Sequence, residues 1–271
     1  MTDAFTDFEH EGWERVADKY DAMWSSSTRQ FIGPLLDSAQ LAAKMSILDV
    51  GCGPGYVSAA AAERGAVPTG LDFSAEMIAI AKKMWPRIEF REGDAQNLPF
   101  GDATFDRVVA NFALLHLAEP ERAMREANRV LKTGGRFGFT TWAKVEQNPF
   151  VKLVDDAIQA HANVDVDLPL GPPFYLFENE EGFRSALERA GFDGGSMSFK
   201  VHTIKWKVPT ARFVFDAELK AGVRTAGLLA RQTPEALRDI QAAIEKSVQQ
   251  YATDDGFAIP KGAYIVAVNK K

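Results

Sequence analysis

Between residues 46 and 142, short β-rich runs alternate with amphipathic helical stretches. The repeat is roughly twenty residues long, which is typical of parallel strands joined by crossover helices. The strand pattern occurs five times, at 46–50, 67–72, 88–93, 105–112 and 136–142. We therefore expect a doubly wound α/β core, a mostly parallel sheet with helices on both of its faces.

The helices between these runs carry recognisable end signals. One begins near Tyr56 and ends at a C-terminal glycine, and the next follows Ser74, whose hydroxyl can cap it. A third starts at Pro120, which suits a first helical turn. The pair Gly134-Gly135 is expected to end that third helix before the fifth strand.

The second half of the chain is less regular. Its patterns predict three helices and two strands, at 179–190, 210–221, 234–250, 198–208 and 259–270. The last strand is expected to complete the sheet in the antiparallel direction. The Pro-rich stretch 169–173 is either a lid over a pocket or an extended connector.

At 271 residues the chain is near the upper limit of a single domain. We expect one domain over 1–271, with a ligand-binding core at about 15–142. Residues from about 143 to 271 would then complete the sheet and form a helical and loop cover over the active site.

The composition excludes several classes of protein. No apolar run approaches the ~18 residues of a membrane-spanning helix, and the acidic N-terminus lacks the pattern of a secretory signal. The net charge is -6, with no dense Lys/Arg cluster for nucleic acid. Cys52 is the only cysteine, which excludes an intrachain disulfide and a multi-cysteine zinc site. We expect a soluble cytoplasmic protein without a metal, membrane insertion or a nucleic-acid partner; its oligomeric state is not readable.

A glycine-rich turn, DVGCGPG at 49–55, follows the first strand directly. Glycines admit positive φ and let a ligand approach the backbone, and the following helix points its amides at that ligand. The dinucleotide fingerprint needs another glycine where Tyr56 stands, and the Lys-Ser/Thr pair of a phosphate loop is absent. The match to the dinucleotide fingerprint therefore fails, and the pattern disfavours a nucleoside triphosphate at this turn.

Two acidic residues follow the next two strands. Asp72 closes the second strand, where a carboxylate can accept hydrogen bonds from ribose hydroxyls. Asp94 closes the third, where it can accept from an exocyclic amine such as that of adenine. Each also has a local alternative: Asp72 could cap the helix after Ser74, and Asp94 could stabilise its own turn.

Taken in order, these segments resemble a known motif set: ILDVGCGPG, GLDFSAEM, EGDAQNLPF, FDRVVANFALLHL and ANRVLKTGGRF. They are similar to the motifs of class I S-adenosylmethionine-dependent methyltransferases, which have a Rossmann-like fold. The similarity is greatest to the small-molecule branch that includes ubiquinone and menaquinone biosynthesis, and it covers about residues 15–142.

The resemblance implies S-adenosylmethionine as cofactor and S-adenosylhomocysteine as product. It implies that the glycine loop lines the methionine moiety, that Asp49 positions its amino group and that Asp72 holds the ribose. The implied cofactor site comprises Tyr20, Asp49, Gly51, Cys52, Gly53, Asp72, Phe73, Met77, Asp94, Ala95, Asn111, Phe112 and His116. Trp13 and Trp24 of the N-terminal region are further candidates.

His116 is the candidate catalytic residue. It follows the fourth strand, and a histidine titrates near neutrality, so it could accept a proton from the methyl acceptor. The alternative is a histidine that only hydrogen-bonds locally or contacts the methionine moiety. Six aromatic residues of the second half could line an apolar pocket or simply pack in the core: Phe174, Tyr175, Phe177, Trp206, Phe213 and Phe215.

These features predict methyl transfer to a small, partly apolar metabolite by in-line displacement, at an oxygen, nitrogen or carbon atom. The partner is then a small-molecule methyl acceptor. Two alternatives stay open: a protein that binds S-adenosylmethionine without catalysis, and, against the glycine pattern, an NAD-dependent oxidoreductase.

Overall fold

A single eight-stranded sheet forms the centre of the protein. The computed structural model describes residues 3–175, 177 and 179–271. The strands are β1 (Ser46–Val50), β2 (Val67–Asp72), β3 (Glu89–Glu92), β4 (Phe105–Asn111), β5 (Leu131–Trp142), β6 (Phe192–Val208), β7 (Ala252–Thr253) and β8 (Gly256–Lys270). Their order is β3-β2-β1-β4-β5-β8-β6, with β7 paired to β8. Strands β1 to β5 are parallel, and β8 and β6 are antiparallel additions, which confirms the predicted fold class.

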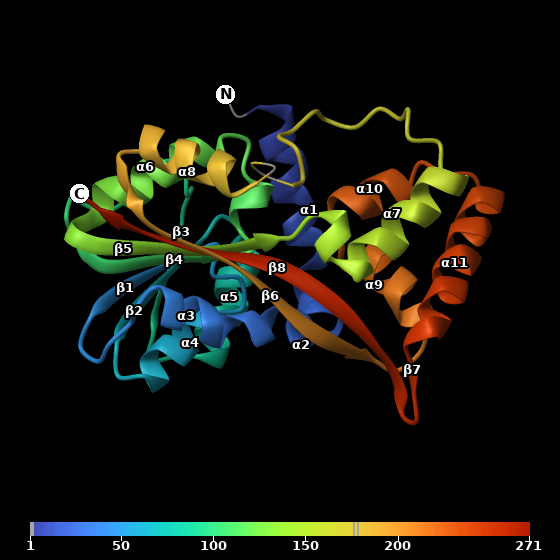
Figure 1. The fold of residues 1–271 in the computed structure, drawn as a ribbon, viewed down its shortest axis with the longest axis horizontal. Helices are drawn as coiled ribbons and strands as arrows, with labels where there is room; N and C mark the ends of the chain where they lie inside the picture. The colour runs from blue at the N-terminus through green and yellow to red at the C-terminus, as the bar shows by residue number, and fades with distance from the viewer. Residues whose placement is uncertain (1–2, 176, 178) are drawn as a thin grey trace.

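Helices cover both faces of this sheet (Figure 1). They are α1 (Ala4–Tyr20), α2 (Ser26–Thr28), α3 (Ile32–Ser38), α4 (Tyr56–Glu63), α5 (Ala75–Met84), α6 (Pro120–Val130), α7 (Pro149–His161), α8 (Glu180–Arg189), α9 (Arg212–Ala221), α10 (Arg224–Leu229) and α11 (Pro234–Val248). Helices α6 and α8 lie on one face, and α3, α4 and α5 lie on the other. No helix within the described residues is both long enough and apolar enough to cross a membrane.

The central strands are apolar because both of their faces are covered. Ile47 and Leu48 of β1, and Val108 and Val109 of β4, are fully inaccessible to solvent. Strands of this kind read as continuous hydrophobic runs rather than as alternating ones. Because β1 pairs in parallel with both β2 and β4, the carboxyl ends of these strands lie at one edge of the sheet, where ligands bind in this architecture.

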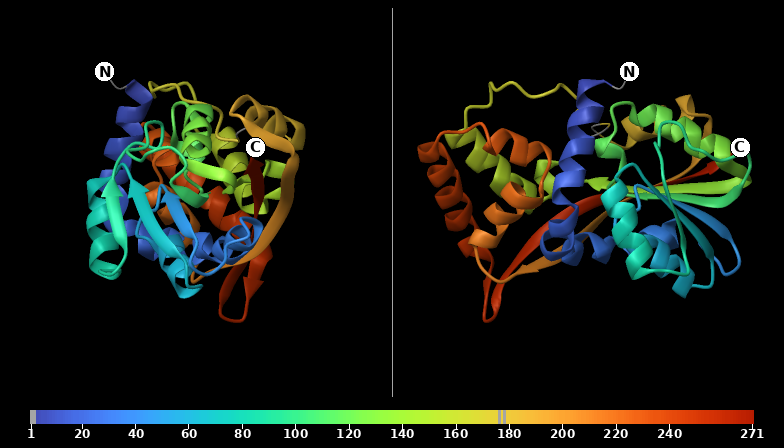
Figure 2. Two further views of the ribbon diagram at one scale, coloured as in Figure 1. Left: turned by 90° about the vertical axis from the view of Figure 1, so that its left-hand side faces the viewer. Right: turned by 180° about the vertical axis from the view of Figure 1, so that it is seen from behind.

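The second half builds a separate helical layer. Strands β6 and β8 extend beyond the rest of the sheet as a long twisted ribbon, and α7, α9, α10 and α11 gather at its far end (Figure 1). Figure 2 shows α1 running between this helical group and the sheet. Helix α1 contacts both α5 and α9, so the first helix of the chain joins the two halves.

Several sequence predictions were wrong in their boundaries. Helix α6 ends at Val130 and β5 begins at Leu131, so Gly134-Gly135 does not separate them. The pair instead follows the start of β5, where its register against β4 is irregular. Strands β6 and β8 begin earlier than predicted, and α7 was missed altogether.

The segment 169–173 has no regular secondary structure and joins α7 to α8. It packs on α1, because a side chain at Gly171 would collide with the ring of Phe5. The carbonyl of Pro172 also accepts a hydrogen bond from Arg224. The segment is therefore a connector held by contacts to α1 and α10; motion as a lid stays a prediction.

Candidate functional site

A cavity of about 1070 Å³ opens at the carboxyl ends of the parallel strands. One wall follows the ends of β1, β2 and β4, and the opposite wall comes from α1 and the helical cover. Eleven of the predicted site residues line it: Tyr20, Gly51, Gly53, Asp72, Phe73, Met77, Asp94, Ala95, Asn111, Phe112 and His116. The topology thus brings together residues that are up to 96 positions apart (Tyr20 to His116) in one space.

The glycine loop between β1 and α4 belongs to the wall formed by the strand ends. Gly51 and Gly53 have φ values of +64° and +50°, a conformation that disfavours side chains. A Cβ at Gly51 would lie 2.4 Å from the Cβ of Ala113, whereas the space beside Gly53 is open for 4 Å. The loop therefore leaves room for a ligand to press against the backbone.

Asp72 is a buried carboxylate in the wall formed by the ends of β1, β2 and β4. Its Oδ2 accepts from the amide of Gly53 at 2.8 Å and its Oδ1 from the amide of Ser74 at 3.0 Å. Burial raises its pKa and these two hydrogen bonds lower it, with a net increase. Both the local turn contact and the position in the cavity wall are thus present. Two oxygens with lone pairs to spare remain on the carboxylate for hydroxyl donors.

Asp94 and Ala95 lie in the next loop along the same wall. The Oδ1 of Asp94 accepts from the backbone and side-chain nitrogens of Gln96, at 2.8 and 3.3 Å. The carboxylate stabilises its own turn and also lines the cavity. Its second oxygen is the one left for a ligand.

Asp49 and Cys52 lie outside the cavity lining. The Oδ2 of Asp49 accepts from the amide and hydroxyl of Ser58, at 3.0 and 2.7 Å, which ties β1 to α4. Its Oδ1 is buried without a hydrogen-bond partner in the described part of the chain. Burial raises the pKa of Asp49 to about 7, and burial also raises that of the Cys52 thiol. The predicted cofactor contacts of both residues stay predictions.

Asn111 and Phe112 end β4 at the cavity. The side chain of Asn111 accepts from the Thr140 hydroxyl at 2.7 Å and donates to the carbonyl of Thr28 at 3.3 Å. Phe112 has a φ of +57°, which is rare for a residue with a side chain. Its ring stacks on Trp142 with centroids 4.0 Å apart. This conformation turns the Phe112 ring into the cavity.

His116 is held by a carboxylate that the sequence did not reveal. Its Nδ1 lies 3.0 Å from Oε2 of Glu9, a fully buried residue of α1. The same carboxylate accepts from the Trp13 indole at 3.1 Å and pairs with Arg224 of α10 at 2.8 Å. Burial raises the pKa of Glu9, but His116 and Arg224 outweigh it and the net shift is downward. Glu9 is thus an ionised centre shared by three chain segments.

The remaining aromatic candidates from the N-terminal region also reach the cavity. Tyr20, Trp13 and Trp24 line it, and the Tyr20 hydroxyl lies 3.0 Å from that of Thr28. Phe73 packs edge-on against His10 of α1, with centroids 5.4 Å apart. Helix α1 therefore forms one side of the cavity.

Among the six aromatic residues of the second half, Phe174 and Tyr175 line the cavity. Trp206 and Phe215 are buried in the core, and Phe213 and Phe177 pack against it. The apolar wall is instead supplied by Trp142, Phe150, Val154 and Ile158, the last three from the missed helix α7.

The far end of the cavity contains charged residues without any sequence motif. Lys261 of β8 and Glu218 of α9 are both buried and line the cavity. Asp155 of α7 lies in the same lining and accepts from the Tyr175 hydroxyl at 3.2 Å. A lysine within the apolar strand 256–270 was the available signal.

Comparison with known proteins identifies the cofactor half. Residues 48–139 match the family model described as a methyltransferase domain. A demethylmenaquinone methyltransferase of Clavibacter sepedonicus is 30% identical over 190 residues, 64% of this chain and 72% of that protein. Its counterpart from Paenarthrobacter aurescens is 35% identical over 128 residues, 46% of this chain and 51% of that protein. The match spans about half the length of the first curated relatives.

The fold is shared with solved structures. The YcgJ protein of Bacillus subtilis superposes with a TM-score of 0.56 at 18% identity, covering 89% of this chain and 98% of that one. The relatives, the matched domain and the glycine-loop geometry agree. The chain belongs to the class I S-adenosylmethionine-dependent methyltransferases.

Proposed function

We propose that the protein transfers a methyl group from S-adenosylmethionine to a small, partly apolar metabolite bound in this cavity. One observation carries the proposal: the cavity joins the glycine loop and Asp72 to an apolar wall of Phe112, Trp142 and Phe150. A cofactor site and an apolar acceptor site are thus continuous, as direct transfer between two ligands requires.

The wall formed by the ends of β1, β2 and β4, which we call the cofactor wall, fits an adenosyl ligand. The open space beside Gly53 accommodates backbone contact, and the Asp72 carboxylate can accept from two ribose hydroxyls. The edge of Asp94 is available to an exocyclic amine, with Phe73 and Met77 in the lining on which a purine can pack. When bound, S-adenosylmethionine would supply a methyl group activated by its positive sulfur.

The protein's own contribution is alignment and the exclusion of water. Helix α1 and the helical cover enclose the acceptor, and the apolar side chains of α7 limit its solvation. Few residues then need to take part in the chemistry. Among the residues beside the strand ends, we assign proton transfer to His116.

In this proposal His116 accepts the acceptor's proton at Nε2. The ionised carboxylate of Glu9 accepts from Nδ1–H, so the neutral imidazole keeps its lone pair on Nε2. Trp13, edge-on to the imidazole with centroids 4.8 Å apart, limits rotation of the ring. Glu9 is therefore a positioning residue, as in other catalytic histidine pairs.

The curated relatives support a ring-shaped acceptor. Their names indicate that they methylate demethylmenaquinone. An aromatic ring of that kind suits the wall formed by Phe112, Trp142 and Phe150. Oxygen, nitrogen and carbon acceptors are all compatible with a proton acceptor at His116.

The first test is calorimetric titration with S-adenosylmethionine, S-adenosylhomocysteine and NAD in parallel. We expect micromolar binding of the two adenosyl ligands and none of NAD. Turnover is then measured as transfer of labelled methyl groups to a panel of hydroxylated and aminated aromatic compounds. Binding of NAD alone would overturn the proposal, and cofactor binding without transfer to any acceptor would favour a non-catalytic binding protein.

A further inference from the structure

Lys261 lies in a box of aromatic rings. Its Nζ is 4.0 Å from the ring centre of Phe150, 4.3 Å from Trp142 and 4.6 Å from both Trp24 and Trp206. The residue is completely buried on β8, where it pairs with Ile204 of β6. Four rings from four different segments converge on one amino group.

This amino group lacks the hydrogen bonds that burial demands. Within the described residues Nζ has no hydrogen-bond partner, although an ammonium has three donors. Cation–π contacts attract the charge but leave the N–H groups unsatisfied. A buried polar atom of this kind indicates a missing partner rather than a finished structure.

The nearest opposite charge does not supply that partner. Glu218 acts on Lys261 through space, but the ion pairs of the described residues include none between the two. Burial lowers the pKa of Lys261 and raises that of Glu218, and the charge of each group opposes the shift of the other. The other titratable groups at this end are Asp155 and Tyr175, which bond to each other.

The position of Lys261 in the cavity points to a ligand. Lys261, Glu218, Trp142 and Phe150 all line the space that reaches the glycine loop. Arg224 also lines it, but each of its three guanidinium nitrogens already donates a hydrogen bond, to Glu9, to the carbonyl of Pro172 or to that of Leu115. Lys261 is thus a cavity cation whose donors are unused.

We propose that Lys261 donates a hydrogen bond to an acidic oxygen, a carboxylate or phenolate, of an aromatic methyl acceptor. The inference names the class of acceptor and so rests on the proposed function. A ring carrying this oxygen packs against the aromatic box, where Trp142 already stacks on Phe112. The ligand oxygen supplies the hydrogen-bond acceptor that Glu218 does not.

Other ligand chemistries fit less well. A phosphate group attracts several basic residues, whereas Lys261 is a single residue and Arg224 already pairs with Glu9. A methylammonium ligand would need the aromatic box, which the lysine itself occupies. An uncharged amide would gain no charge assistance from the ammonium.

The experiment uses three probes with one apolar body: 2-naphthoate, 2-naphthol and 2-naphthamide. Binding of each is measured by calorimetry to the full chain with S-adenosylhomocysteine present. We expect at least one acidic probe to bind about tenfold more tightly than the amide. Preference for naphthoate identifies a carboxylate, and preference for naphthol identifies a phenolate.

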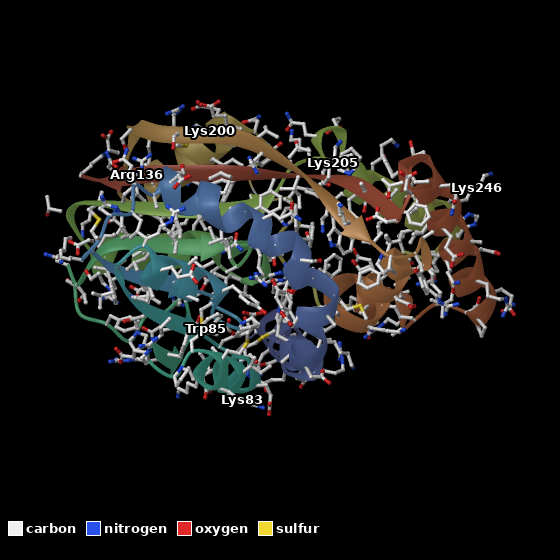
Figure 3. The ribbon with its side chains drawn as sticks, turned by 90° about the horizontal axis from the view of Figure 1, so that it is seen from below. Lys83, Trp85, Arg136, Lys200, Lys205 and Lys246 are labelled. Carbon is white, nitrogen blue, oxygen red and sulfur yellow. The ribbon has the colours of Figure 1, made fainter. Side chains whose placement is uncertain are left out.

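Lys261→Met removes the charge and keeps an apolar side chain of similar length. We expect it to abolish the preference for the acidic probe. Lys205→Met is the matched control, since Lys205 is exposed on the neighbouring strand β6 (Figure 3), and it should retain the preference. Because Lys261→Met leaves Glu218 buried without its opposite charge, the double variant Lys261→Met/Glu218→Gln, which removes both charges, is tested beside it and should lose the preference in the same way.

Titration of each variant with S-adenosylhomocysteine separates this inference from the proposed function. Failure of the wild-type chain to bind S-adenosylhomocysteine would defeat the methyltransferase proposal. The preference among the three probes would still decide whether Lys261 binds an acidic oxygen. Equal affinities for acidic and amide probes, absence of binding by all three probes, or an unchanged preference in Lys261→Met would each overturn the assignment of Lys261.

Discussion

The two walls of the cavity differ in how their charges are satisfied. On the cofactor wall, Asp72 and Asp94 accept hydrogen bonds from amides within their own loops. On the cover wall, Lys261 and Glu218 are both buried, and the Lys261 amino group has no hydrogen-bond partner within the described residues. The buried donor of the second wall thus lacks a partner in the part of the chain that the structure describes, whereas the carboxylates of the first wall have theirs. If both proposals hold, the cofactor binds at the first wall and the methyl acceptor is selected at the second.

The largest expected effect is at His116, where the two walls meet. His116→Ala should lower turnover by roughly 10²–10⁴-fold, because it removes the proton acceptor. Affinity for S-adenosylhomocysteine, measured by calorimetry, should be retained. Loss of turnover and affinity together would assign His116 to cofactor positioning and would attach it to the first wall.

Glu9→Gln tests whether the Glu9 carboxylate links the two walls of the cavity through His116 and Arg224. The variant leaves Arg224 and His116 without their ionised partner, and we expect a loss of about 3 kcal/mol in the free energy of unfolding. The pKa of Glu9 is lowered below its ordinary value of 4.5, so its stabilisation is present above that pH and is lost as the pH falls through the lowered value.

Denaturant unfolding at neutral and at acidic pH measures this effect. The difference between wild type and Glu9→Gln should shrink in acid. A difference that is constant with pH would contradict the ionised state of Glu9. Glu11→Gln, an exposed position on the same helix, is the control.

Asp72→Ala sharpens the description of the cofactor wall. It removes the acceptor for ribose hydroxyls and should weaken binding of S-adenosylmethionine by about 1.5–3 kcal/mol. Asp72→Asn keeps the shape and one acceptor oxygen, so it should lose less. Unchanged affinity for S-adenosylmethionine in a folded Asp72→Ala variant would refute the ribose assignment. A changed preference among methyl acceptors would show that the two walls do not act separately.

Asp49→Asn has the smallest expected effect, on stability rather than on the cavity lining. The pKa of Asp49 is raised from 3.8 to about 7, so its contribution is greatest below 3.8 and is lost as the pH rises through 7. The asparagine does not titrate. Measured by denaturant unfolding, its stability relative to wild type should therefore rise by about 2 kcal/mol between pH 5 and pH 8. An equal difference at the two pH values would show that Asp49 is ionised throughout.

The cofactor half was predictable because its signals are local. Strand burial on both faces leaves continuous apolar runs, and the glycine loop and Asp72 stand directly at strand ends. Helix α7 also had a local signal that was passed over: Asn148 caps it and Pro149 starts it. No element was predicted there, because the segment that follows is rich in proline, glycine and aromatic residues.

The cover half could not be predicted in the same way. The box around Lys261 depends on rings at positions 24, 142, 150 and 206, which only the folded chain brings together. From the sequence alone, Glu9 does not differ from the other acidic residues of its polar helix, because its partner Arg224 lies on the distant helix α10. In both cases the meaning of a charged residue lies in distant partners, not in its sequence neighbours.

The contact between Glu9 and Arg224 also sets an order of events in folding. The two residues are 215 positions apart, so their pairing closes nearly the whole chain. Contacts of such long sequence separation form late, after local structure has restricted the chain. During synthesis α1 leaves the ribosome before α10, so Glu9 has no Arg224 to pair with until 215 further residues have been made. We therefore expect the sheet to assemble before the cavity closes, with docking of α1 as a final step.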